Sequence, residues 1–168
     1  MNRHLSNKCL IIFITVTAVV LLDQVTKAGI ASKMLLHDSS IIIKGLLNLT
    51  YVRNPGAAFG FLSHASPVFR SAFFILTTVS AIGLIFYYVA VSKEDETCLV
   101  FALSLILGGA AGNLIDRVRF GEVVDFIDVY WKTYHWPAFN VADAAISLGA
   151  FIMIFEMLWR KKKIVEAP

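Results

Sequence analysis

Residues 67–91 read PVFRSAFFILTTVSAIGLIFYYVAV, and Arg70 is the only charged residue in this apolar run. A helix needs about 20 mostly apolar residues to cross the hydrocarbon core of a bilayer. A helix on the surface of a soluble protein would instead carry a polar stripe along one face. Residues 76–91 carry no charge on any face, so this stretch predicts a transmembrane helix.

Three further apolar blocks flank this run, at about residues 9–30, 97–115 and 138–159. Apolar residues make up 58% of the chain, whereas soluble domains contain about 45–50%. The mean hydropathy of the chain is +0.73. These values predict an all-α membrane protein with four transmembrane helices, which form a single integral membrane domain over residues 1–168.

The first apolar block has features of a secretory signal peptide, because Arg3 and Lys8 precede the apolar residues Leu10–Leu22. A signal peptide would end at a cleavage site of small residues, such as Ala-x-Ala. Asp23 and Lys27 stand where those small residues should be. We therefore expect the first block to be a retained transmembrane helix.

Four spans place both ends of the chain on the same side of the membrane. Arg3 and Lys8 precede the first span, and the run Arg160–Lys163 follows the last. Short segments rich in basic residues beside a transmembrane span favour the cytoplasmic side, so both termini are expected in the cytoplasm. The basic tail also supplies much of the net charge of +3. Beside a helix end, such a run indicates anionic membrane lipid and not nucleic acid.

This topology leaves two outer segments, at about residues 31–66 and 116–137. In the first, Ile41–Ile43 is a β-branched run and Leu47–Arg53 roughly alternates. Leu47, Leu49 and Tyr51 would share one face, while Asn48, Thr50 and Arg53 would mostly share the other. The residues Asn54-Pro55-Gly56 indicate a turn. We expect a small β-rich extracytoplasmic subdomain that lies on the membrane surface.

Two other patterns bear on packing. The third span contains Gly108-Gly109-Ala-Ala-Gly112, a small-residue face that predicts close contact between helices. The second outer segment contains Trp131, Tyr134 and Trp136, which are typical of side chains that anchor a protein at the membrane interface.

Polar residues gather near the outer ends of the predicted spans: Asp23, Lys27, Asn113, Asp116, Arg117, Glu122, Asp125, Asp128, Asn140 and Asp143. Ionisable groups are costly beside the hydrocarbon, so each is a functional candidate. The spacing of Asp23 and Lys27 also favours a structural ion pair on one helical face. Asp116 next to Arg117 is interpreted as an interfacial pair.

Asp143 is harder to explain as a structural residue, because apolar residues flank it in the stretch 139–147. Two facing carboxyl groups can divide acid and base work, since like charges held close cannot both ionise. Asp143 is an obvious candidate for one of the two carboxyl groups of such a pair. The residue pattern does not choose its partner among Asp116, Glu122, Asp125 and Asp128, although Glu122 and Asp128 are expected to be solvated.

Five stretches match one known family in order and spacing: DQVTK at 23–27, RNPGAAF at 53–59, GGAAGNLIDR at 108–117, GEVVDFID at 121–128 and FNVADA at 139–144. Together they closely resemble the bacterial lipoprotein signal peptidase, or signal peptidase II, family. The resemblance implies that Asp125 and Asp143 are the catalytic aspartates. It also implies that a second set shapes the site or contacts ligand: Asp23, Lys27, Asn54, Gly56, Asn113, Arg117 and Asn140.

The resemblance further implies an intramembrane aspartic endopeptidase. This family removes the signal peptide from prolipoproteins whose cysteine carries a diacylglyceryl group, and it cuts just before that cysteine. Its site lies at the outer face of the bacterial inner membrane, and the cyclic peptide globomycin inhibits it. The implied partners are therefore prolipoprotein substrates and membrane lipid, with no nucleic acid and no cofactor.

Three other kinds of protein are possible: an ion-coupled transporter, a serine protease and a non-catalytic assembly protein. An ion-coupled transporter would bury its carboxylate near the midplane and show an inverted repeat. A serine protease would need a Gly-x-Ser-x-Gly motif or a histidine near Ser147, and the chain has neither. A metal site is not expected, because the four histidines are scattered and no His-Glu-x-x-His occurs. A non-catalytic assembly protein would tolerate the loss of both aspartates.

Overall fold

The computed structural model describes residues 3–56, 62, 65–92 and 96–166. It contains four long helices, α1 (Arg3–Lys33), α2 (Pro67–Val91), α3 (Thr97–Phe120) and α4 (Val141–Glu166). Each contains a segment long and apolar enough to cross a membrane. The four predicted spans are therefore confirmed as helices of transmembrane character, although α3 continues past residue 115 and α4 begins after residue 138.

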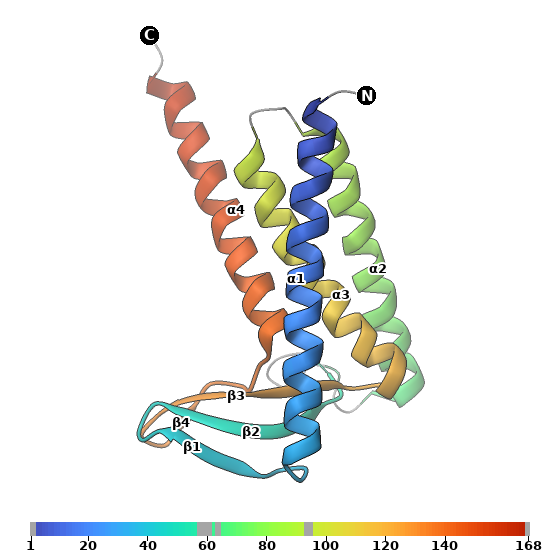
Figure 1. Cartoon of the computed structure of the whole chain (residues 1–168), viewed down its shortest axis with the longest axis vertical. Coiled ribbons are helices and arrows are strands. Elements are labelled where there is room, and N and C mark those ends of the chain that lie inside the picture. The colour runs from blue at the N-terminus through green and yellow to red at the C-terminus, as the bar shows by residue number, and fades with distance from the viewer. Residues whose placement is uncertain (1–2, 57–61, 63–64, 93–95, 167–168) are drawn as a thin grey trace.

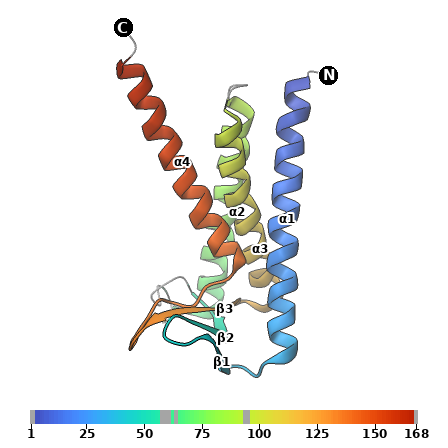
Figure 2. The same cartoon turned by 60° about the vertical axis from the view of Figure 1, so that its left-hand side comes forward.

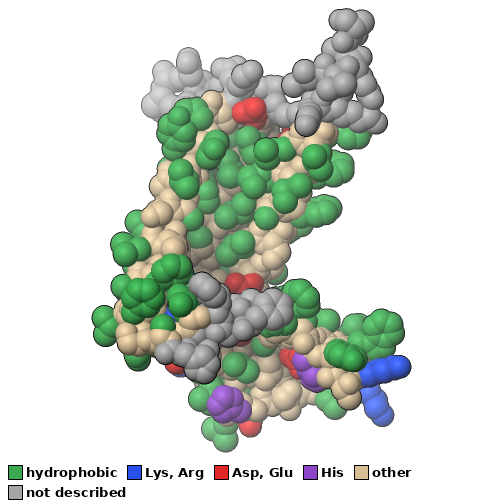
Figure 3. Space-filling view, turned by 180° about the vertical axis from the view of Figure 1, so that it is seen from behind, with side chains coloured by type: hydrophobic (Ala, Val, Ile, Leu, Met, Phe, Trp, Pro, Cys, Tyr) green, Lys and Arg blue, Asp and Glu red, His purple; other side chains and the backbone are tan. Residues whose placement is uncertain are grey.

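The four helices run side by side, and the sheet lies across one end of them (Figures 1 and 2). The start of α1 and the end of α4 lie at the opposite end. Helix α3 is central, because 56% of its apolar segment is buried, against 11–17% for the other three helices. Many large apolar side chains remain exposed on α1, α2 and α4, and apolar side chains cover much of the helical face seen in Figure 3. Such a surface suits contact with lipid.

The small residues of α3 allow α1 and α4 to approach closely, as the sequence predicts. A Cβ added at Gly108 would lie 2.9 Å from the Val19 Cβ atom, and one at Gly109 would collide with the carbonyl oxygen of Ala142. At Gly112 an added Cβ would lie only 2.7 Å from the Asp23 Oδ2 atom. Gly112 therefore leaves room for a buried carboxylate as well as for a helix.

The sheet has four antiparallel strands in the order β1-β2-β3-β4, with bounds β1 (Ser39–Ile43), β2 (Leu47–Asn54), β3 (Val123–Trp131) and β4 (Tyr134–His135). Strands β1 and β2 confirm the two strand signals in the first outer segment. Strand β3 pairs with β2 along most of its length, from Leu47 opposite Val129 to Asn54 opposite Val123. The sequence did not predict β3 and β4.

The predicted alternation of β2 holds only in its first half. Asn48 and Thr50 are both buried, but so is the next residue, Tyr51, because the register shifts between Leu49 and Val52. The buried donors have partners: Asn48 Nδ2 donates to Asp128, and Thr50 donates to the Asp38 carbonyl oxygen. The isoleucines of β1 are exposed instead, which suits a sheet beside lipid.

Candidate active site

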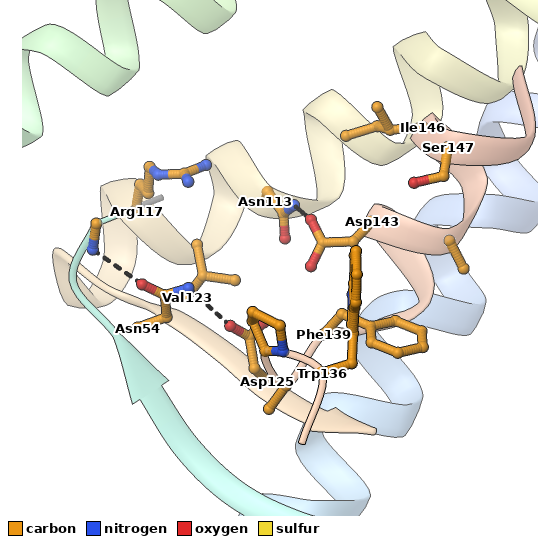
Figure 4. Close-up of a pocket in the computed structure, with 14 residues that line it drawn as sticks. Asn54, Asn113, Arg117, Val123, Asp125, Trp136, Phe139, Asp143, Ile146 and Ser147 are labelled. Carbon is orange, nitrogen blue, oxygen red and sulfur yellow. Dashed lines mark hydrogen bonds between the residues drawn. The ribbon is translucent and has the colours of Figure 1, made fainter. Parts of the chain in front are cut away.

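A pocket of about 490 Å³ lies where the sheet meets the ends of α3 and α4 (Figure 4). Its volume falls within the range of about 300–1,000 Å³ that is usual for ligand sites. Six of the nine predicted site residues line it: Asn54, Gly56, Asn113, Arg117, Asp125 and Asp143. The other three, Asp23, Lys27 and Asn140, are buried. Lys27 and Asn140 form hydrogen bonds with the pocket residues Asn113 and Asp125, and Asp23 forms an ion pair with Lys27.

Asp125 lies in the middle of β3, where its backbone pairs with Val52 of β2. Its side chain is buried and accepts two amide hydrogen bonds, from Asn54 Nδ2 at 2.9 Å and from Asn140 Nδ2 at 2.7 Å. The pKa of the Asp125 carboxyl is raised to about 7: burial is the main cause, the hydrogen bond from Asn54 opposes the shift, and the charge of Asp143 adds to it. Both protonation states are thus accessible near neutral pH, as acid–base catalysis requires.

Asp143 lies in the first turn of α4, two residues after Val141 begins the helix. Its backbone N–H donates to Asn140 Oδ1 at 2.9 Å, and its Oδ2 accepts from the Asn140 backbone N–H at 3.3 Å. This reciprocal pair is the arrangement of a capping box, which stabilises the start of a helix. The other oxygen, Oδ1, accepts from Asn113 Nδ2 at 2.8 Å (Figure 4). Both carboxyl oxygens of Asp143 therefore accept hydrogen bonds, and its carboxyl group lines the same pocket as that of Asp125.

Asn54 is held by the turn that follows β2. Its Oδ1 accepts from the backbone N–H of Gly56 at 3.0 Å, which leaves Nδ2 directed at Asp125. Gly56 itself is buried. Residues 57–59 of the family-like stretch that begins at Arg53 lie outside the described residues.

A second group of charges lies beneath the pocket. Lys27 Nζ is 2.8 Å from Asp23 Oδ2 and 3.0 Å from Asp116 Oδ2, and all three side chains are buried. Asp23 also accepts from the backbone N–H of Ala142, and Asp116 from that of Val124. The predicted Asp23–Lys27 ion pair is confirmed, and it ties α1 to α3, to β3 and to the start of α4.

The predicted pairing of Asp116 with Arg117 is wrong. Consecutive residues on a helix point about 100° apart, so the two side chains face different neighbours. Asp116 faces Lys27, whereas the Arg117 guanidinium lies over the Phe74 ring, 4.9 Å from its centre, at the edge of the pocket. The sequence did not predict that Asp116 belongs to the buried charged group with Asp23 and Lys27. Its position one turn after Asn113 was the signal that could have placed it there.

Comparison with known proteins identifies the family. The model of the signal peptidase (SPase) II family matches residues 15–159. The chain belongs to the signal peptidase II family. Lipoprotein signal peptidases of Syntrophus aciditrophicus and Geobacter sulfurreducens are 51% and 50% identical to it. These alignments cover 93% and 88% of this chain, and 98% and 89% of the relatives.

Solved structures agree with this assignment. A bacterial membrane enzyme structure obtained by the in meso method at 2.3 Å resolution superposes with a TM-score of 0.83 and 36% identity, covering 94% of this chain and 93% of that one. A second, at 1.9 Å resolution, superposes with a TM-score of 0.77 and 33% identity, covering 88% and 92%. The fold of four apolar helices with a small sheet is thus shared with membrane enzymes.

Other members of the candidate list lie away from the pocket of this signal peptidase II chain. Asp128 was expected to be solvated, but it accepts from Asn48 at 2.8 Å and pairs with His135, also at 2.8 Å, within the sheet. Trp131 and Tyr134 are exposed at the end of the sheet, as interface anchors would be. Among the described residues, no three histidine, cysteine or acidic side chains are grouped as around a metal ion.

Proposed function

We propose that this protein is an aspartic endopeptidase that removes the signal peptide from diacylglyceryl-modified prolipoproteins, with Asp125 and Asp143 as its catalytic pair. The supporting observation is that both carboxyl groups line one pocket and that amide groups donate hydrogen bonds to each of them. Among the described residues, neither forms an ion pair within the site, although Arg117 lines the same pocket. Family membership supports the substrate, because the curated relatives are lipoprotein signal peptidases.

The pair works with one shared proton. The ionised aspartate takes a proton from a water molecule as the water oxygen attacks the scissile carbonyl carbon, and the protonated aspartate gives its proton to the carbonyl oxygen. In the second step the C–N bond breaks, and one aspartate protonates the departing nitrogen while the other takes a hydroxyl proton. The products are the free carboxyl end of the signal peptide and the amino group of the lipidated cysteine. The pair returns to its starting state with one proton.

The walls of the pocket fit a lipidated substrate. Apolar side chains line part of the pocket: Trp136, Phe139 and Ile146 lie near Asp143, and Val123 lies beside Asn54 and Arg117 (Figure 4). The polar side carries Asn54 and Arg117, which can hold backbone carbonyl groups of an extended peptide. A substrate of this kind has an apolar signal helix on one side of the scissile bond and a diacylglyceryl group on the other. Its backbone carbonyl groups between them are polar.

We propose further that both termini are cytoplasmic and that the pocket opens at the outer face of the bacterial inner membrane. The start of α1 and the end of α4 lie together at the end of the molecule away from the sheet (Figure 1). The basic residues at both ends of the chain favour the cytoplasmic side for that end. The sheet and the pocket are then at the outer interface, at the depth of the cleavage site.

Purified protein tests this function directly. It is incubated with a diacylglyceryl-modified prolipoprotein and, in parallel, with the same prolipoprotein lacking the lipid. Mass spectrometry is expected to show cleavage before the cysteine of the lipidated form only, and globomycin is expected to stop it. Equal cleavage of both forms, or no cleavage of either, would contradict the proposed substrate.

A further inference from the structure

The side chain of Asn113 connects the buried charges to the proposed catalytic pair. Its Oδ1 accepts from Lys27 Nζ at 2.9 Å and from Asn140 Nδ2 at 3.2 Å, and its Nδ2 donates to Asp143 Oδ1 at 2.8 Å. The two ends of a carboxamide differ chemically, and its partners decide which end faces which group. A lysine ammonium can only donate hydrogen bonds. The end of Asn113 that faces Lys27 must therefore be the oxygen, which forces an N–H group toward Asp143.

Asn140 continues the same pattern to the second aspartate. Its Nδ2 donates to Asn113 Oδ1 and, at 2.7 Å, to Asp125 Oδ1, while its own Oδ1 accepts from the Asp143 backbone N–H. The orientation of each amide is consistent with that of the other. Lys27 is thus one hydrogen-bonded side chain away from Asp143 and two away from Asp125.

All the hydrogen-bond donors of the Lys27 side chain are already used within the protein. Its ammonium has three N–H groups, and three acceptors surround it, on Asp23, Asp116 and Asn113. The side chain is buried and does not line the pocket. Lys27 therefore does not touch a substrate in the pocket. It can act on the pair in two ways, through the hydrogen bond to Asn113 and through its charge, which opposes the rise in the pKa of Asp125.

We propose that Lys27 is a positioning residue for catalysis: by holding the oxygen of Asn113, it keeps an amide N–H directed at Asp143. This inference rests on the proposed peptidase function. It differs from a purely structural role, in which Lys27 only neutralises Asp23 and Asp116. Without Lys27, the Asn113 amide is free to turn over and present its oxygen to the carboxyl group of Asp143. Two facing oxygens are tolerated only when a proton lies between them, so the singly ionised pair becomes harder to form.

Other charges also face Asp143 and enter any pH profile. They are Asp23 from α1, Arg117 from α3 and Asp125 from β3, and Asp116 of α3 joins this group through its ion pair with Lys27. The test must therefore remove Lys27 without changing the net charge of this group. The double variant Lys27→Met/Asp116→Asn does so, because it removes one positive and one negative charge together.

Two further variants isolate the path through Asn113. Gln24→Met is the matched control, because Gln24 donates to Asp116, to Asp23 and to the Gly112 carbonyl oxygen but not to Asn113 or Asn140. Asn113→Leu leaves the Lys27 ion pairs in place and removes the three hydrogen bonds of the Asn113 side chain, to Lys27, Asn140 and Asp143. All variants are compared as folded protein in the same detergent, with cleavage of a diacylglyceryl-modified prolipoprotein measured from pH 5 to pH 9.

The expected result is a fall in kcat of about tenfold or more in Lys27→Met/Asp116→Asn, with KM changed by less than about threefold, as for a group that acts on the transition state. The acidic limb of its pH–rate profile moves to higher pH. Asn113→Leu shows the same shift, and adding it to the double variant causes no further loss, since both changes break one connection. Gln24→Met keeps the wild-type profile.

A wild-type pH profile in Asn113→Leu would overturn the proposal, and this holds even if the double variant fails to fold. Losses that multiply when Asn113→Leu and the double variant are combined would also overturn it, because independent effects add in free energy. A failure of the proposed function appears differently. In that case the wild-type protein does not cleave the substrate, or Asp143→Asn cleaves it as fast as the wild type.

Discussion

The structure contains two pairs of carboxylates a short distance apart, and their partners differ: Asp23 and Asp116 are fully buried, whereas Asp143 of the second pair is only partly buried. Asp23 and Asp116 share the ammonium of Lys27, and backbone N–H groups complete their hydrogen bonds. Asp125 and Asp143 receive hydrogen bonds from side-chain and backbone amides, and they line an open pocket. A buried ion pair holds the side chains that form it in place, whereas the raised pKa of Asp125 leaves that carboxyl able to gain and lose a proton near neutral pH. The first pair is therefore suited to holding the fold, and the second to catalysis.

The largest expected effect is on cleavage by variants of the second pair. Asp125→Asn and Asp143→Asn should each lower the cleavage rate by about 10²–10⁴ or more, because asparagine cannot accept the proton of water. Each variant should still insert in the membrane and bind globomycin. The rate is measured in single-turnover assays on purified protein, and Asp116→Asn, corrected for its folded fraction, is the comparison. Cleavage at the wild-type rate by either variant would remove that aspartate from the mechanism.

The next largest effect is on stability, through the first pair. Lys27→Leu leaves two buried carboxylates without a cation, which should lower the free energy of unfolding by about 3–5 kcal/mol. Thermal melting in detergent measures the change. Lys33→Leu, at the exposed end of the same helix, is the matched control and should melt close to the wild type. Equal melting temperatures for the two variants would show that the buried ion pairs do not stabilise the fold.

A smaller effect is expected in the pH dependence of protein stability. Because burial raises the pKa of Asp125 to about 7, folding favours its protonated form. This contribution to stability is fully present below the unfolded pKa of about 4 and is lost as the pH rises through about 7. The wild type should therefore lose melting temperature between pH 5 and pH 8 relative to Asp125→Asn. Parallel pH dependence of the two proteins would contradict the raised pKa.

The smallest effect tests a third carboxylate on the same strand as Asp125. Asp128 pairs with the partly exposed His135 in the sheet, outside the pocket. Exposed ion pairs contribute at most about 1 kcal/mol, so Asp128→Asn should change stability little and cleavage by less than about threefold. A loss as large as that of Asp125→Asn, only three residues away, would mean that the site extends along β3.

The features that the sequence predicted well depend on local patterns. The four apolar runs, strands β1 and β2 and the Asp23–Lys27 pair at i,i+4 each need only neighbouring residues. Strand β3 was missed although Val123, Val124 and Ile127 favour a strand, because the same stretch carries the acids Glu122, Asp125 and Asp128, of which the first and last were expected to be solvated. One of those acids, Asp125, is among the most buried residues of the molecule.

The connections of the site could not be predicted, because they join residues far apart in the chain. Asn113 lies 86 residues from Lys27 and 30 from Asp143, and its two ends contact both. Spacing within a helix gives the face of a side chain but not the neighbour that the face meets. The five family-like stretches indicated which residues matter, and only the fold shows which of them donate and which accept.

The central claim is that Asp125 and Asp143 act as one catalytic unit. The most direct test is the single-turnover cleavage rate of the double variant Asp125→Asn/Asp143→Asn against each single variant, with a diacylglyceryl-modified prolipoprotein. Residues that work as a unit lose nearly everything when either is removed, so the double variant should be about as slow as the slower single variant. Losses that multiply in the double variant would show two independent contributions and would contradict a shared acid–base pair.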